Sequence, residues 1–169
     1  MQAVKWAFVI VIGTLGPSVG HTEEQSTCSV EAAEDPARVV YHCPNGLFIE
    51  AETLEELSGI VPHELLEIQS IDVEGRAVLI EVPPEDGPFQ VRTPFAIASV
   101  RGTTYVVDAH LNQTDVFVIE GRVHVANPDG SQEVEVLDGQ GVTFGTSVAP
   151  EVRSWPDDRV EALLERFGR

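Results

Sequence analysis

Arg101 is the side chain in this sequence with the clearest capacity for specific chemistry. It stands next to Gly102, where two β-rich runs of sequence meet. A guanidinium offers a rigid fork of N–H donors that pairs bidentately with a carboxylate. Arg101 could therefore bind a carboxylate ligand, or it could hold Glu120 or an aspartate inside the fold. Because the fork suits buried pairing equally well, we favour the structural role.

Histidine and aspartate side chains form no metal-binding pattern. The five histidines are scattered, without the His-x-His pair and glutamate of a cupin-type site. Aspartates near predicted turns make calcium conceivable, but no EF-hand loop accompanies them. We expect neither a metal nor any other cofactor. These residues are His21, His42, His63, His110, His124, Asp108, Asp115, Asp129 and Asp138.

Covalent and phosphate chemistry also lack support. Gly139-Gln140-Gly141 is a short glycine pattern with no helix predicted after it, so we interpret it as a turn and not as a phosphate loop. The cysteines are expected to be bonded to each other and unable to act as nucleophiles. The sequence predicts that the protein is not an enzyme.

Residues 1–20 have the pattern of a secretory signal peptide. Lys5 precedes the apolar run 6–12, and Ser18 and Gly20 supply small residues for cleavage after position 20. The apolar run is too short for a bilayer, which needs about 20 residues. An uncleaved anchor is the alternative. We expect residues 21–29 to form a disordered mature N-terminus.

Export determines how the two cysteines are interpreted. Cys28 and Cys43 are the only cysteines, and an oxidising compartment favours a disulfide between them. The alternative is a pair of metal ligands, but neither a CxxC nor a CxH spacing is present. We therefore predict a Cys28–Cys43 bridge in an exported protein, periplasmic or secreted.

The charge of the chain restricts its partners. The formal net charge is −18, and Lys5 is the only lysine. Such an acidic body repels nucleic acid and anionic lipid, so we expect neither as a partner. We also expect no membrane span once the leader is removed.

Short β-rich runs separated by Gly and Pro dominate the rest of the sequence. They predict an all-β fold, a compact sandwich, barrel or short β-roll, as one domain over residues 30–169. The region 53–68 is ambiguous and is expected to hold short helical turns at most. The expected strands are 38–42, 47–50, 77–82, 89–93, 122–125, 133–137 and 142–144.

The C-terminal segment changes to a helical period, which predicts an amphipathic helix over residues 155–167. Ser154 could cap it, and Pro156 suits its first turn. A helix this short is marginal alone, so its apolar face must be buried. We expect it to dock on the β-body, with a partner's groove as the alternative. The apolar residues are Trp155, Val160, Leu163, Leu164 and Phe167.

The centre of the chain, from Phe89 to Phe144, resembles the FecR domain family. The similarity lies in Thr93-Pro94, Val100-Arg101-Gly102-Thr103, the run 118–125 with Glu120-Gly121, and Leu137-Asp138-Gly139-Gln140. The resemblance implies an all-β periplasmic or surface module that works through protein contacts and has no catalytic residues. It also implies that these motif residues are mainly structural.

One departure from the family limits what the resemblance implies. The regulator that gives the family its name has a cytoplasmic anti-sigma segment and a membrane helix before its periplasmic domain, whereas only a leader is expected here. We therefore expect a stand-alone exported module that binds an unknown envelope protein, in a signalling or structural role. The alternatives are a binder of small ligands or carbohydrates, and a hydrolase with an unrecognised site.

Overall fold

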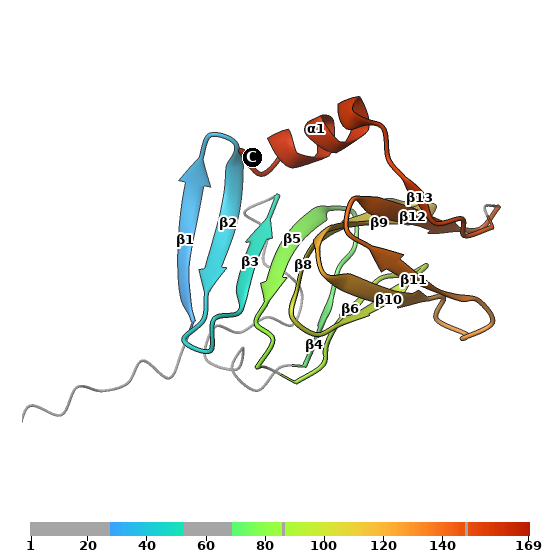
Figure 1. Cartoon of the computed structure of the whole chain (residues 1–169). Helices are drawn as coiled ribbons and strands as arrows, with labels where there is room; N and C mark the ends of the chain where they lie inside the picture. The colour runs from blue at the N-terminus through green and yellow to red at the C-terminus, as the bar shows by residue number, and fades with distance from the viewer. Residues whose placement is uncertain (1–27, 53–68, 86, 148) are drawn as a thin grey trace, which may run out of the picture.

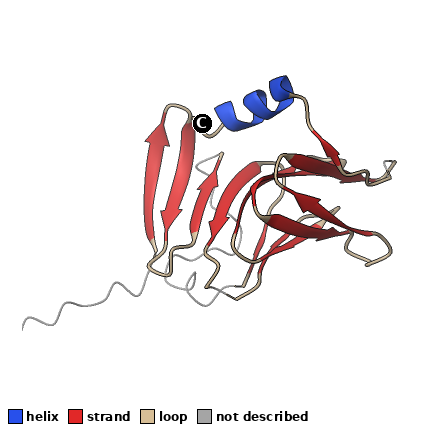
Figure 2. Ribbon diagram, in the orientation of Figure 1, coloured by secondary structure: helices blue, strands red, loops and turns tan. Residues whose placement is uncertain are grey.

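A computed structural model describes residues 28–52, 69–85, 87–147 and 149–169. Two β-sheets and one helix make up this part of the chain (Figure 1, Figure 2). The predicted signal peptide and the ambiguous region 53–68 lie outside the described residues. No helix in the described ranges has the length and apolarity needed to cross a membrane.

The larger sheet, here called the long sheet, has eight strands and is antiparallel throughout. In spatial order its strands are β1 (Ser29–Glu34), β2 (Ala37–His42), β3 (Phe48–Ala51), β5 (Ala77–Val82), β8 (Thr103–Ala109), β9 (Gln113–Glu120), β12 (Gln140–Gly145) and β13 (Arg153–Ser154).

The short sheet has five strands, of which only the pair β4–β6 is parallel. In spatial order they are β11 (Glu133–Leu137), β10 (Arg122–Ala126), β7 (Ile97–Val100), β6 (Phe89–Arg92) and β4 (Ser70–Asp72). The main core contains buried side chains of both sheets, including Ile80 and Val107 of the long sheet and Val91 and Val123 of the short one. The fold is therefore all-β and sandwich-like, as the sequence predicts.

The helix α1 (Asp157–Glu165) covers the outer face of the long sheet (Figure 1). A second apolar cluster fills this layer and includes Leu79, Phe117, Trp155, Leu163 and Phe167. This arrangement explains the nearly continuous apolar sequence of β5. Its alternate residues face opposite sides, and here the main core covers one face and the helix layer covers the other.

Trp155 anchors the segment that leads into α1 to the long sheet. Its indole stacks on Phe117, with ring centroids 5.2 Å apart, and lies against Gly141. A Cβ on Gly141 would stand 2.2 Å from the indole, so only glycine leaves room for this contact. The predicted cap is wrong: Ser154 belongs to β13, and Pro156 is the N-cap residue. The helix is also shorter than predicted, although Phe167 beyond its end is buried.

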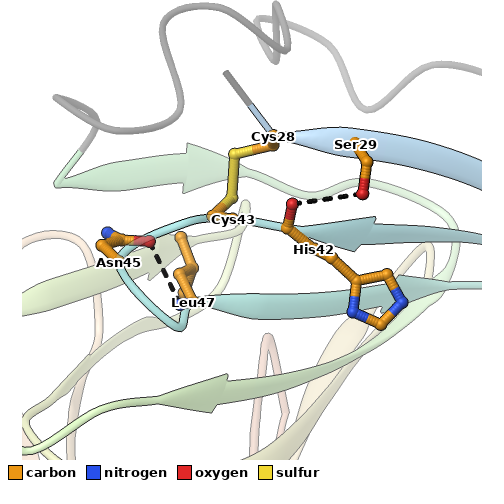
Figure 3. The surroundings of a disulfide bond; sticks show 6 residues. All are labelled: Cys28, Ser29, His42, Cys43, Asn45 and Leu47. Atoms are coloured by element: carbon orange, nitrogen blue, oxygen red, sulfur yellow. Dashed lines mark hydrogen bonds between the residues drawn. A yellow bond between two sulfur atoms is a disulfide. The ribbon is translucent and has the colours of Figure 1, made fainter. Parts of the chain in front are cut away.

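The disulfide predicted from the sequence joins Cys28 to Cys43 (Figure 3). It ties the start of β1 to the residue after β2, beside the hydrogen bond from the Ser29 hydroxyl to the His42 carbonyl. Cys28 is buried and Ser29 begins β1, so these two residues of the segment 21–29 are ordered, contrary to the prediction, and the rest of the segment lies outside the described residues. Pairing with β2 accounts for the difference, because it gives a polar and otherwise weak strand a backbone partner.

The packing of α1 yields a stability prediction with a matched control. We expect Leu163→Ala to lower the free energy of unfolding by about 2–4 kcal/mol, because it leaves a cavity beneath the helix. Leu111→Ala, at a side chain that is 96% exposed, should change it by less than about 0.5 kcal/mol. Urea denaturation of both variants measures the difference. Equal stability of the two variants would show that α1 does not belong to the core.

Candidate functional site

The motif residues meet where the chain passes between the two sheets. It leaves the short sheet after β7 and enters the long sheet at β8, and it returns between β9 and β10. Gly102 turns the first crossing with a φ of 65°, and Gly121 turns the second with a φ of 96°. Residues with a Cβ rarely adopt this left-handed conformation, so glycine is required at both turns.

The two crossings touch each other, and together with Pro84 they form what we call the sheet corner: Pro84, Gly102, Thr103 and Gly121. A Cβ on Gly121 would lie 2.9 Å from the Gly102 carbonyl oxygen, and one on Gly102 would lie 3.0 Å from Pro84. The Thr103 hydroxyl donates to the Arg122 carbonyl at 2.9 Å. The motif therefore joins the sheets by close backbone contact and by a buried threonine.

Other motif residues hold turns between neighbouring strands. The Thr93 hydroxyl accepts a hydrogen bond from the Ala96 amide at 2.9 Å and lies 2.7 Å from the Thr114 hydroxyl on β9. Pro94 stands in the turn that Thr93 holds, between β6 and β7. Gly139, with a φ of 71°, turns the chain from β11 to β12 and donates from its amide to the Val118 carbonyl. At these positions the side chains and glycines hold turns.

Arg101 does not form the buried ion pair predicted from the sequence. Arg101 and Glu120 are both exposed, and the Arg101 Nε donates to the Pro84 carbonyl at 3.3 Å. The sequence places Arg101 correctly at a strand junction. However, the sequence does not reveal that backbone atoms and glycines make the tight contacts of the sheet corner. Because they fill the corner, the long Arg101 side chain turns outward.

Charged groups that could do chemistry gather between α1 and the long sheet. Asp108 and Asp115 are direct partners in the ladder between β8 and β9, and both are buried. Two buried like charges opposite each other are unfavourable without compensation. The His110 Nε2 lies 3.2 Å from the Asp108 Oδ2 and 3.6 Å from the Asp115 Oδ2.

Two arginines of the helix segment supply the compensation. The Arg159 Nη2 lies 3.1 Å from the Asp115 Oδ2, and its guanidinium stacks 3.4 Å from the centre of the Trp155 ring. Arg166 pairs with Asp108 and also with Glu52, at 2.6 Å from Nη2 to Oε2. We call these five residues the helix clamp: Glu52, Asp108, Asp115, Arg159 and Arg166.

Ionisation in the helix clamp follows from this pairing. Hydrogen bonding from Arg166 holds the pKa of the Glu52 carboxyl below its usual range, and the same hydrogen bonds raise the pKa of Arg166. Glu52 and Arg166 therefore stay charged at neutral pH. A cavity of about 180 Å³ lies beside them, but their charged groups are engaged with each other. In the described residues no group of three or more His, Cys, Asp or Glu side chains is placed to hold a metal ion.

The described surface offers a different kind of site on the outer face of the short sheet. An open groove of about 290 Å³ lies there, which we call the basic groove. Arg101 and Arg122 flank it, and Leu137, the ladder partner of Arg122, is 43% exposed beside it. The lining residues are Pro88, Ser99, Val100, Arg101, Arg122, His124 and Glu135.

A strand edge is the other feature that could recruit a protein. β1 ends the long sheet, pairs with β2, and is exposed along most of its length (Figure 1). Glu31 and Glu34 stand on this strand. Charged residues on an edge strand discourage pairing with a further strand. The basic groove is therefore the better candidate for a contact surface.

The motif residues up to position 124 fall within a match to a known protein family. The family model described as FecR protein matches residues 56–124, and the resemblance predicted from the sequence is confirmed there. The matched range begins before the predicted similarity and ends before Gly139. No curated protein matches the chain.

Two crystal structures share the fold, each of a candidate anti-sigma factor from Parabacteroides distasonis ATCC 8503. The first is 20% identical, with a TM-score of 0.57, and the match covers 80% of this chain and 64% of that one. The second is 22% identical, with a TM-score of 0.51, and the match covers 82% of this chain and 61% of that one. The chain thus spans less than two thirds of the length of either neighbour.

The paired arginine Arg166 and the exposed arginine Arg101 give different predictions for the free energy of unfolding. Arg166→Ala leaves Asp108 buried without its partner, and because Arg166 is itself partly exposed we expect a loss of about 2–3 kcal/mol. Arg101→Ala removes an exposed side chain, so the free energy of unfolding should change by less than about 0.5 kcal/mol.

Urea denaturation of the two variants at neutral pH tests this difference. A large loss of unfolding free energy for Arg101→Ala would support the buried ion pair predicted from the sequence and contradict the exposed position of Arg101. Unchanged stability of Arg166→Ala would show that the helix clamp contributes nothing.

Proposed function

We propose that this chain is an exported, non-catalytic FecR-type module that acts in the bacterial envelope by binding another protein. The FecR match and the likeness to candidate anti-sigma factors support a signalling-related role, because both groups are regulatory. The Cys28–Cys43 disulfide supports a periplasmic or secreted location, since such bonds persist in oxidising compartments.

The observation that carries the proposal is the character of the short sheet's outer face. The chain has a net charge of −18, yet Arg101, Arg122 and His124 stand exposed around one groove. Leu137 adds exposed apolar surface beside them. Arginine next to apolar surface is characteristic of protein interfaces. The helix packs on the long sheet and not on this face (Figure 2).

A binder of small ligands or carbohydrates is the second candidate. A cleft of about 270 Å³ is lined by Phe95, Asn127, Asp129 and Gln132, a mixture of aromatic and polar groups that suits a sugar. However, the Asn127 Oδ1 accepts from the Gln132 amide at 2.9 Å, and the Asp129 Oδ1 accepts from the Ser131 amide at 2.9 Å. These side chains hold the turn between β10 and β11, so a sugar would have to compete with it.

A hydrolase is supported less well. Two buried carboxylates, Asp108 and Asp115, lie close to His110 at the helix clamp, where Arg159 and Arg166 engage the acids. A general acid or base needs a free position facing substrate and a pKa near the working pH. The pKa of Glu52 is lowered, away from neutral pH, so its carboxyl stays ionised.

Photo-cross-linking in cells tests the proposal with two leucine positions. A photoreactive residue replaces Leu137 on the outer face of the short sheet or Leu111, which is 96% exposed on the loop between β8 and β9. We expect the Leu137 probe to trap a discrete envelope protein and the Leu111 probe to trap none. Equal labelling from both probes, or none from Leu137, would contradict the proposal.

A further inference from the structure

Resting on the proposed function, we further propose that the basic groove recognises an acidic side chain in an extended segment of the partner protein. Arg101 and Arg122 would bind the carboxylate, while Pro88 and Leu137, which are exposed, would contact apolar residues beside it. The occupant is therefore a Glu or Asp flanked by apolar residues.

Among the described residues no acid pairs with Arg101, so its guanidinium has capacity for a carboxylate. Its Nε donates to the Pro84 carbonyl, and this contact orients the guanidinium without neutralising it. Other arginines of the described ranges, such as Arg92 and Arg166, pair with acids of the chain. Arg101 has no such ion pair in the same ranges. Its terminal nitrogens can therefore make the two parallel hydrogen bonds of a bidentate pair.

Arg122 adds a second cation that is only weakly engaged. Its Nη1 lies 3.6 Å from the Glu135 Oε2, and the two side chains are 70% and 52% exposed. Exposed pairs of this kind contribute little, so a partner carboxylate can replace Glu135 at small cost. His124 is occupied similarly by Glu133, at 3.3 Å.

The acidic body of the protein does not prevent this recognition. At physiological ionic strength charges are screened beyond about 8 Å, so distant acids act weakly on a ligand in the groove. The contacts within the groove therefore decide whether a ligand carboxylate is attracted or repelled. A highly acidic segment would still be repelled as it approached, which favours a single acid among apolar residues.

The shape of the groove favours an internal acidic residue over a chain end. The groove is open and crosses from Pro88 past β7 and β10 to Glu135 on β11. Capture of a C-terminal carboxylate usually relies on a nest of backbone N–H groups. Side chains line this site instead, and its volume of about 290 Å³ suits a short segment of chain.

Blocked peptides test the inference directly. We would titrate the full ¹⁵N-labelled chain with an acetylated and amidated heptapeptide that has one central Glu among Val and Thr residues. A matched peptide carries Gln in place of Glu, and a third carries Gln with a free C-terminus. We expect chemical-shift changes at Ser99, Arg101, Arg122 and His124 with the Glu peptide, and at least about tenfold weaker binding of both others.

Variants assign the binding to the two arginines. Arg101→Gln should weaken binding of the Glu peptide about tenfold, and the double variant with Arg122→Gln should abolish it. Arg153→Gln, at an exposed arginine of β13 on the other sheet, should bind as the unmodified chain does. Equal binding of the Glu and Gln peptides, stronger binding of the free C-terminus, no binding at millimolar concentration, or unchanged binding by Arg101→Gln would each overturn the proposal.

The cross-link at Leu137 separates this inference from the proposed function. If the Leu137 probe traps a partner equally well in the Arg101→Gln, Arg122→Gln background, the protein contact stands and carboxylate recognition fails. If the probe traps no partner at all, the proposed function itself fails.

Discussion

The contact between Gly102 and Gly121 is the constraint on which the rest of the structure depends. The chain passes twice between the sheets within about 20 residues, and both passes occupy the same small volume. A Cβ on Gly121 would stand 2.9 Å from the Gly102 carbonyl oxygen, closer than real Cβ atoms approach. Because β7 and β10 lie side by side in one sheet and β8 and β9 in the other, this contact sets the alignment of both layers.

The second constraint is electrostatic and acts on the outer side of the long sheet. The register of β8 with β9 places Asp108 opposite Asp115, and the helix segment brings Arg159 and Arg166 to them. A short helix gains little from its own hydrogen bonds, so apolar burial and ion pairs must hold it in place. The clamp and the Trp155 layer therefore use the charged and aromatic groups that would otherwise be the first candidates for chemistry.

Much of this fold follows from local sequence. Alternation, Gly-Pro punctuation and the helical period of Val160, Leu163 and Phe167 predict the strands and the C-terminal helix. The pair Cys28 and Cys43, which follows a leader-like segment, predicts the disulfide. These features depend on residues that are near each other in the chain, so local patterns are sufficient to find them.

The remainder depends on contacts between distant parts of the chain. β1 is polar, and only its pairing with β2 makes it a strand. Asp108 and Arg166 are 58 residues apart, so no local pattern predicts their pairing. Arg101 shows the same limit. The sequence predicts that Arg101 stands at a strand junction, but the direction of its side chain depends on how Gly102 packs against Pro84.

The motif residues divide into two groups: the glycines and Thr103 build the corner, and Arg101 faces outward, where we propose that it meets a partner. The free energy of unfolding of Gly121→Ala, measured by urea denaturation, tests this division most directly. Because alanine would need a left-handed backbone and would strike the Gly102 carbonyl, we expect a loss of at least about 2 kcal/mol. Stability within about 0.5 kcal/mol of the unmodified chain, together with lost cross-linking from the Leu137 probe, would contradict the account and make the corner itself a binding element.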